Sequence, residues 1–258
     1  MTYFATTPAK LNLSLAVTGK RGGMHTLDMI VYPYEKYVDS VEFCPIEGAR
    51  GFEIEIVGGF EGLDKDRFLL FANDKLQRIS TYFEVGGRLS IVKGVPLGAG
   101  LGGSSATLAC AVKAVTEYLK ETGQNTRLDV DFLLSLGSDV PYMVNGGICR
   151  VSGVGEVVEE IEGKGKIEVC EIIAKGGSDS GACYKLFDEL HGENFDLQNI
   201  PSSVDEALCV LRNDLFEPAC VLNPNIKEAR DALKKEGYDK ILMSGSGSAV
   251  FAIKGFAE

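Results

Sequence analysis

The sequence predicts an α+β protein built from two sub-domains. Alternating patterns typical of strands and 3.6-residue patterns typical of helices both recur along the chain. The 258 residues are 45% hydrophobic, which is enough to fill one large core or two small ones. Near Ser152 the pattern changes, and a new strand pair begins around a turn that contains Gly and Lys. We therefore expect sub-domains over residues 1–152 and 153–258.

The first half opens with strands. In "AKLNLSLAV", Leu11 and Leu13 point to one face, while Lys10 and Asn12 share the other. "GKRGGMHTL" indicates a turn, and "YVDSVEF" and "GFEIEIV" read as further strands. A helical pattern over 66–79 is followed by the strand "GRLSIVKGV".

Helices then alternate with strands to the end of the chain. After a glycine-rich stretch, apolar residues recur at i, i+4, i+7 and i+11 from Leu108, which predicts a helix. "NTRLDVDFLLSLG" predicts another helix, and "SDVPYMVNGGICRVSG" predicts loop and strand. The remaining elements are a strand over 167–174, helices over 181–190, 203–211 and 224–236, and a last strand "SAVFAI".

Composition argues against several functions. The chain has 26 basic and 37 acidic residues, and its net charge of −11 would repel nucleic acid. A local cluster of backbone N–H groups can still bind a small anion. No apolar run approaches the ~20 residues that span a bilayer, so no membrane is expected. The seven cysteines form no CxxC pair, which favours a reducing cytosol and a cytoplasmic protein.

The few histidines narrow the chemistry further. His25 and His191 are the only two, so a His-rich metal site or a Ser-His-Asp hydrolase is hard to build. Any catalysis then depends on Lys, Asp, Ser and backbone amides.

The stretch "VPLGAGLGGSSATLACAV" has two explanations. Gly98, Gly100 and Gly103 satisfy G-x-G-x-x-G, but the acidic residue expected about 20 residues later would fall inside a helix, which excludes a dinucleotide fingerprint. No lysine follows the glycines, which excludes a Walker A loop. Two explanations remain open. The stretch could begin a helix whose N–H groups hold a phosphate, or it could be a plain strand-to-helix turn capped by serine. The stretch contains more glycines than a helix cap needs, which favours the phosphate site.

Three segments together resemble a known family. "PAKLNL", "PLGAGLGGSSA" and "SGSGSAVFAI" are similar, in order and spacing, to the signature motifs of the GHMP small-molecule kinases. The resemblance implies a nucleotide-binding N-terminal domain with a left-handed βαβ unit and a ferredoxin-like C-terminal domain. "VKGVPLGAGLGGSS", "LGSDVPYMVNGG" and "RNDLFEPA" resemble the branch that acts on cytidine-diphosphate-linked methylerythritol in the non-mevalonate isoprenoid route.

The resemblance also implies residue roles. Asp139 would accept the proton of the acceptor hydroxyl, and Lys10 would stabilise the developing charge. Taken singly, Lys10 is more typical of a solvent-facing strand position and Asp139 of a turn; their joint match to the family pattern favours the catalytic roles. ATP and Mg²⁺ would be the cofactors, with Ser104 and Ser105 near the metal. The implied nucleotide contacts are Lys93, Pro96, Gly98, Gly100, Leu101, Gly102, Gly103, Ser104 and Ser105. The implied substrate contacts are Asn12, His25, Asp139, Tyr184 and Gly245, with His25 hydrogen-bonded to cytosine and Tyr184 stacked on it.

Some positions depart from the pattern of that branch. The glycine loop is one residue shorter and lacks an aspartate, and Met24 replaces a tyrosine that would complete the cytosine sandwich. Arg67 and Phe68 replace an Asn-Leu pair beside the adenine.

The expected function is ATP-dependent phosphorylation of the 2-hydroxyl of cytidine-diphosphate-linked methylerythritol. A kinase for another small alcohol and a non-catalytic nucleotide sensor are the alternatives. The partner would be this small molecule, with no nucleic acid, no membrane, and a monomer or a homodimer as the assembly.

Overall fold

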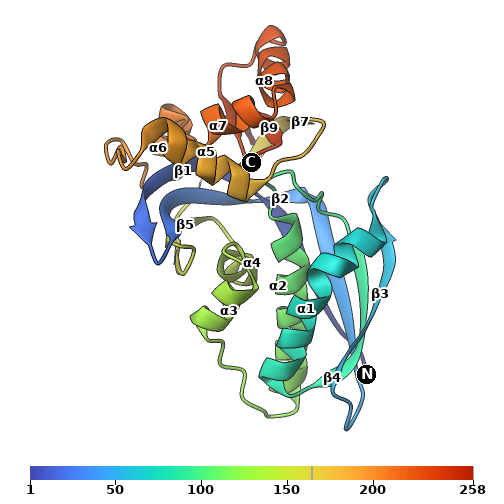
Figure 1. Cartoon of the computed structure of the whole chain (residues 1–258). Helices are drawn as coiled ribbons and strands as arrows, with labels where there is room; N and C mark the ends of the chain where they lie inside the picture. The colour runs from blue at the N-terminus through green and yellow to red at the C-terminus, as the bar shows by residue number, and fades with distance from the viewer. Residues whose placement is uncertain (164, 258) are drawn as a thin grey trace. The chain divides into compact units, whose positions relative to one another are not determined.

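The computed structural model describes residues 1–163 and 165–257, and it confirms the mixed α+β class (Figure 1). The chain forms two compact units that each combine separate segments. The first unit comprises Met1–Ala9, Tyr34–Pro96 and Gly102–Gly146; the second comprises Lys10–Pro33, Leu97–Leu101 and the chain from Gly147 onward. Two long strands and the glycine stretch therefore contribute residues to both units. The sequence boundary after residue 152 stays a prediction.

The first unit contains a βαβ arrangement. β3 (Gly51–Gly59) and β4 (Gly86–Lys93) are adjacent and parallel, and α1 (Lys65–Phe83) connects them. β4 also pairs antiparallel with β2 (Met24–Pro45), which in turn pairs with β1 (Tyr3–Arg21). The register places Val41 opposite Ile91, so both side chains reach the same buried face.

Helices complete the first unit. They are α1, α2 (Gly103–Glu121), α3 (Val130–Leu136) and α4 (Val140–Asn145). α1 begins after Asp64, whose carboxylate accepts a hydrogen bond from the Arg67 N–H at 3.0 Å. α2 begins after Gly102, which has a left-handed conformation and, as a glycine, has no side chain to cap the first N–H groups of the helix.

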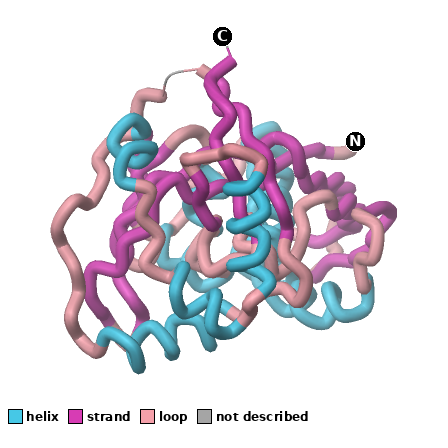
Figure 2. Tube along the Cα trace, turned by 90° about the horizontal axis from the view of Figure 1, so that it is seen from above, coloured by secondary structure: helices cyan, strands magenta, loops and turns pink. Residues whose placement is uncertain are grey.

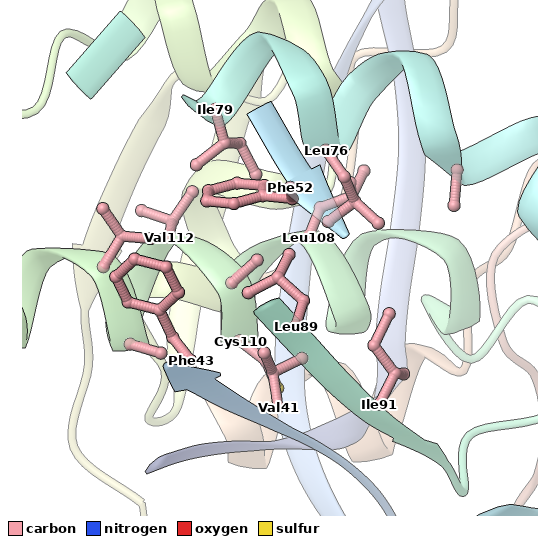
Figure 3. Close-up of a cluster of buried hydrophobic side chains, with 14 of the residues drawn as sticks. Val41, Phe43, Phe52, Leu76, Ile79, Leu89, Ile91, Leu108, Cys110 and Val112 are labelled. Carbon is pink, nitrogen blue, oxygen red and sulfur yellow. The ribbon is translucent and has the colours of Figure 1, made fainter. Parts of the chain in front are cut away.

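The core of the first unit lies between the helices and the sheet (Figure 3). Phe43 and Phe52 meet edge to face, with ring centroids 5.6 Å apart. α1 contributes Leu76 and Ile79, and α2 contributes Leu108, each at most 1% exposed. This packing fixes α2, and with it the end of the glycine stretch.

The second unit has two sets of strands. Residues 27–31 of β2 pair antiparallel with β5 (Cys149–Gly153), which pairs with β6 (Val157–Glu160). A separate antiparallel sheet has the order β7 (Lys166–Ile173), β9 (Ala249–Ala257), β8 (Ile241–Met243). Figure 2 draws all strands in magenta and all helices in cyan. The helices are α5 (Ser180–His191), α6 (Val204–Val210), α7 (Phe216–Leu222) and α8 (Asn225–Lys235).

The structure corrects some sequence-based elements. The predicted turn "GKRGGMHTL" shrinks to Gly22 and Gly23, because β1 and β2 form one long hairpin. α4, α7 and β8 were not predicted, since each has seven residues or fewer and carries no clear period. Within the described residues, no helix combines the length and apolar character needed to cross a membrane.

Candidate active site

The glycine loop, residues 98–101, is held by its carbonyl groups. Each of its four successive carbonyl oxygens accepts a hydrogen bond from a different residue of the second unit. The donors are the Ser178 N–H to Gly98 O at 3.0 Å, the Ala249 N–H to Ala99 O at 2.9 Å, the Ser244 hydroxyl to Gly100 O at 2.9 Å and the Lys10 N–H to Leu101 O at 3.0 Å.

The N–H groups of the same loop are left over. Among the residues that the structure describes, none accepts a hydrogen bond from the N–H of residues 98–101. A run of backbone N–H groups with no protein partner is suited to bind an anion such as a phosphate. This favours the phosphate-cradle explanation of the sequence over the plain turn.

Gly100 must be glycine at this junction. Its φ is +73°, and a Cβ at this position would lie 2.0 Å from the Ser244 carbonyl oxygen. The absence of a side chain therefore allows the glycine loop to approach residues 244–248, which we call the serine loop.

Lys10 lies at this junction too. Its ammonium donates to Asn12 Oδ1 at 2.5 Å, and the Asn12 N–H donates to Ser244 Oγ at 3.2 Å. Lys10 is 4% exposed and Asn12 1%. A Cβ on Gly245 would lie 3.2 Å from Lys10 Nζ, which places the serine loop beside the ammonium. The structure thus brings together Lys10, Asn12, Gly100 and Gly245.

Asn213 holds the serine loop in place. Its side-chain amide donates to Met243 O at 2.7 Å and to Gly245 O at 2.9 Å. Its Oδ1 accepts from the Leu215 N–H at 2.9 Å, which fixes the orientation of the amide. No role was predicted for Asn213 or Ser244, although they lie inside the segments "RNDLFEPA" and "SGSGSAVFAI" that carry the resemblance.

His25 and Tyr184 are in contact within the second unit. Their rings stack with centroids 4.8 Å apart and an interplanar angle of 20°. His25 Nε2 lies 2.8 Å from Asp188 Oδ1, and the other oxygen of Asp188 lies 2.8 Å from Lys20 Nζ. Met24, beside His25 in the chain, is 53% exposed. Asp188 was missed by sequence reasoning, although it follows Tyr184 by four residues on one helix and so shares its face.

Other predicted site residues belong to the first unit. Asp139 occupies the N-cap position of α4, where it is half-buried and makes no cap hydrogen bond to the helix. Ser104 and Ser105 lie in the first turn of α2, whose leading N–H groups have no partner within the helix. Pro96 precedes the glycine loop, and Phe68 is buried in the core at 1% exposure.

Lys93 was predicted to contact the nucleotide, but its ammonium is buried and paired within the protein. Its side chain is fully buried, and its ammonium donates to both oxygens of Asp39 at 2.9 and 2.7 Å and to Val95 O at 2.5 Å. All three of its N–H donors are thereby used. Burial lowers the pKa of Lys93, and the Asp39 charge opposes that shift. A contact between this ammonium and a nucleotide does not fit the geometry, and we assign Lys93 a structural role.

Asp39 is the centre of this network. Besides Lys93, it accepts from the N–H groups of Gly94 at 2.9 Å and Val95 at 2.8 Å, and from the Thr107 hydroxyl at 2.5 Å. The carboxylate therefore ties the end of β4 to α2 on either side of the glycine loop. The sequence signal was an acidic residue two positions before Val41 and four before Phe43, which places it on the same buried face of the strand.

Comparisons with known proteins agree with this architecture. The family model for the N-terminal domain of GHMP kinases matches residues 68–148, and the model for the C-terminal domain of GHMP kinases matches residues 197–255. A 4-diphosphocytidyl-2-C-methyl-D-erythritol kinase of Shouchella clausii is 32% identical, over 98% of this chain and 86% of its own. A protein of the same name from Desulfitobacterium hafniense is 32% identical, over 95% of this chain and 84% of its own.

Solved structures of kinases also match this chain over nearly its whole length. A crystal structure of a 4-(cytidine 5'-diphospho)-2C-methyl-D-erythritol kinase matches with a TM-score of 0.72 and 27% identity, covering 99% of this chain and 91% of the other. A homoserine kinase from Cytophaga hutchinsonii matches with a TM-score of 0.64 and 17% identity, covering 99% and 85%. The second match supports the fold alone.

Proposed function

This chain belongs to the GHMP kinase family, and from that premise we propose that it transfers the γ-phosphoryl group of ATP to the 2-hydroxyl of 4-diphosphocytidyl-2-C-methyl-D-erythritol. The relatives supply the acceptor by their names. The structural observation that carries the proposal is the glycine loop, whose carbonyl groups all accept hydrogen bonds within the protein and whose N–H groups donate to none of the residues that the structure describes.

Phosphoryl transfer depends on positioning and on charge neutralisation. We assign the ATP phosphates to the backbone of residues 98–103 and to the first turn of α2, where N–H groups and the helix dipole favour negative charge. The hydroxyls of Ser104 and Ser105 are assigned to the same end of the nucleotide. Pro96 is assigned to the nucleotide site as well.

The acceptor hydroxyl is assigned to Lys10, Asn12 and Asp139. The Lys10 ammonium, buried and held by Asn12, is placed to stabilise negative charge on the transferred group. The Asp139 carboxylate would accept the proton that the hydroxyl loses, and the meeting of Asp139 with Lys10 is part of the proposal. The Gly245 backbone lies beside the ammonium, and a side chain at this position would crowd Lys10 Nζ and the Gly100 backbone.

Magnesium fits this assignment as an ion held chiefly by phosphate. Among the described residues there is no cluster of three or more His, Cys, Asp or Glu side chains able to hold a metal. Mg²⁺ in kinases commonly has few protein ligands and several phosphate and water ligands. Ser104 and Ser105 are the residues that would contribute, and the bound ion would neutralise charge on the phosphates.

The cytidine end is assigned to His25 and Tyr184. The His25 imidazole would hydrogen-bond the cytosine, and the Tyr184 ring would contribute an aromatic surface. We further propose a cytoplasmic protein, in line with the cysteine content, that acts as a monomer or a homodimer.

Product formation tests the proposal. The purified chain is incubated with ATP, Mg²⁺ and 4-diphosphocytidyl-2-C-methyl-D-erythritol, and ADP release and the mass of the product are measured. We expect one ADP for each phosphorylated substrate, and no comparable turnover with homoserine or mevalonate. Folded protein that turns over homoserine or mevalonate instead would show that the acceptor is wrong, and ATP binding without turnover of any alcohol would indicate a nucleotide sensor.

A further inference from the structure

We propose that Asp188 is a positioning residue that keeps the imidazole proton of His25 on Nε2, so that Nδ1 accepts a hydrogen bond from the amino group of cytosine. Asp188 would thereby set the preference for cytidine over uridine. The inference rests on the proposed function, which supplies the cytidine group, and it goes beyond that function by naming the residue that selects the base.

The contact between Asp188 and His25 determines the position of the proton. Nε2 lies 2.8 Å from Asp188 Oδ1. An ionised carboxylate can only accept hydrogen bonds, so Nε2 must be the donor. Lys20 Nζ, 2.8 Å from the other carboxylate oxygen, favours that ionised state. Burial raises the pKa of Asp188, but the hydrogen bonds from Lys20 and His25 outweigh burial and hold that pKa below its ordinary value.

The ring of His25 is also fixed in orientation. Tyr184 stacks on one face, and Phe187 meets the ring edge-on with centroids 6.2 Å apart and an interplanar angle of 87°. The side chain of His25 is only 11% exposed. Nδ1 hydrogen-bonds to no residue that the structure describes. It is therefore the one polar atom of the ring that remains for a ligand.

Helix α5 supplies these partners together. Tyr184 and Asp188 are four residues apart and lie on one face of the helix, so the helix presents its ring and its carboxylate to the same imidazole. His25 itself lies at the start of β2, next to the tight turn of the hairpin. The arrangement is built from α5 and the two strands of the hairpin, with Lys20 at the end of β1, and does not depend on a loop.

The chemistry of the two pyrimidines gives the selectivity. A neutral imidazole with its proton on Nε2 has an acceptor at Nδ1. Cytosine carries an amino group at C4, which donates, whereas uracil carries a carbonyl oxygen at C4, which accepts. Nδ1 therefore forms a hydrogen bond with cytosine, and two acceptors face each other when uracil is bound. A polar site built for one hydrogen bond discriminates strongly against an analogue that cannot make it.

Nucleotide binding tests the selectivity. The dissociation constants of CDP and UDP are measured by calorimetry for the full chain and for Asp188→Asn. The Asn amide can either accept from Nε2 or donate to it, so it no longer dictates the proton position. We expect the wild type to prefer CDP by about 10-fold or more, and the variant to lose most of that preference. Glu189→Gln removes the same charge from the next, exposed position and should keep the wild-type preference.

Nitrogen-15 spectra of the imidazoles test the proton directly. The chain has only two histidines, and His191→Gln assigns them. We expect the Nε2–H form of His25 in the wild type and a substantial Nδ1–H population in Asp188→Asn. This measurement on the wild type also decides the question if Asp188→Asn fails to fold.

Different results contradict different claims. A wild type with His25 in the Nδ1–H form or protonated on both ring nitrogens, or a CDP preference that survives Asp188→Asn, would overturn the role of Asp188 while leaving the proposed function intact. A wild type that binds neither CDP nor UDP would contradict the cytidine substrate itself, and the selectivity of His25 with it.

Discussion

Gly100→Ala and Gly98→Ala distinguish two reasons for a glycine in this loop: the left-handed backbone conformation and the lack of space for a Cβ. Both residues have positive φ, +73° and +65°, so alanine at either position pays about 1–2 kcal/mol for a left-handed backbone. Only Gly100 has a neighbour in the way: its Cβ would lie 2.0 Å from Ser244 O and 2.9 Å from Gly247 O, whereas the nearest atom to a Cβ on Gly98 is 3.8 Å away.

The difference between the two variants follows from these distances. Because a backbone oxygen cannot give way alone, Gly100→Ala must push the serine loop outward, which adds about 1–3 kcal/mol of overpacking. We expect Gly98→Ala to lower the free energy of unfolding by about 1–2 kcal/mol. Gly100→Ala should lower it by about 2–5 kcal/mol, the sum of the two effects.

Denaturant unfolding and ADP release measure the two consequences. Unfolding curves in urea give the stability difference, and the two variants are compared at the same temperature and pH. The Ser244 hydroxyl donates to Gly100 O and accepts from the N–H of Asn12, which lies on the same strand as Lys10. A displaced serine loop would disturb Lys10 as well, so kcat should fall more in Gly100→Ala than in Gly98→Ala. Equal stability losses and equal kcat values in the two variants would refute the packing of the glycine loop on the serine loop.

Three further predictions follow. Lys93→Met leaves the buried Asp39 carboxylate without its ammonium and should lower the free energy of unfolding by about 3–5 kcal/mol, part of which Lys93→Met/Asp39→Asn should restore, as denaturant unfolding can show. Burial raises the pKa of the Cys110 thiol to about 12, so mass spectrometry after iodoacetamide treatment at pH 8 should find Cys209, which is exposed, alkylated well before Cys110. The folded-state pKa of Asp188 lies below its ordinary value, so the stability it contributes is present above about pH 4 and is lost as the pH falls further; the difference in urea midpoint between wild type and Asp188→Asn should shrink over that range.

The sequence predicted elements best where a long period was present. The helices that became α1, α2 and α8 and the strands around Leu11, Leu89 and Phe251 agree with the structure, because each buries one continuous face. Short elements such as α4 and α7 depend on their tertiary contacts and have no period to read. The β1–β2 hairpin was underestimated, since its residues near the turn are polar and exposed.

The site was predictable only in part, for physical reasons. Lys10 and Asn12 share a strand face, so their contact follows from alternation. Lys93 shows the opposite case: a lysine at a strand end reads as a surface group until its partner, Asp39, is found 54 positions away. Ser244 and Asn213 act through contacts with backbone carbonyls, which no residue pattern encodes.

The kinetics of Asp139→Asn test the central claim most directly. The variant keeps the shape of the side chain and removes the proton acceptor, so turnover should fall about 10²-fold or more, while the dissociation constant of ATP stays near that of the wild type. A rate equal to the wild type, measured on folded protein with saturating ATP and acceptor, would contradict the proposal that this carboxylate takes the proton of the acceptor hydroxyl.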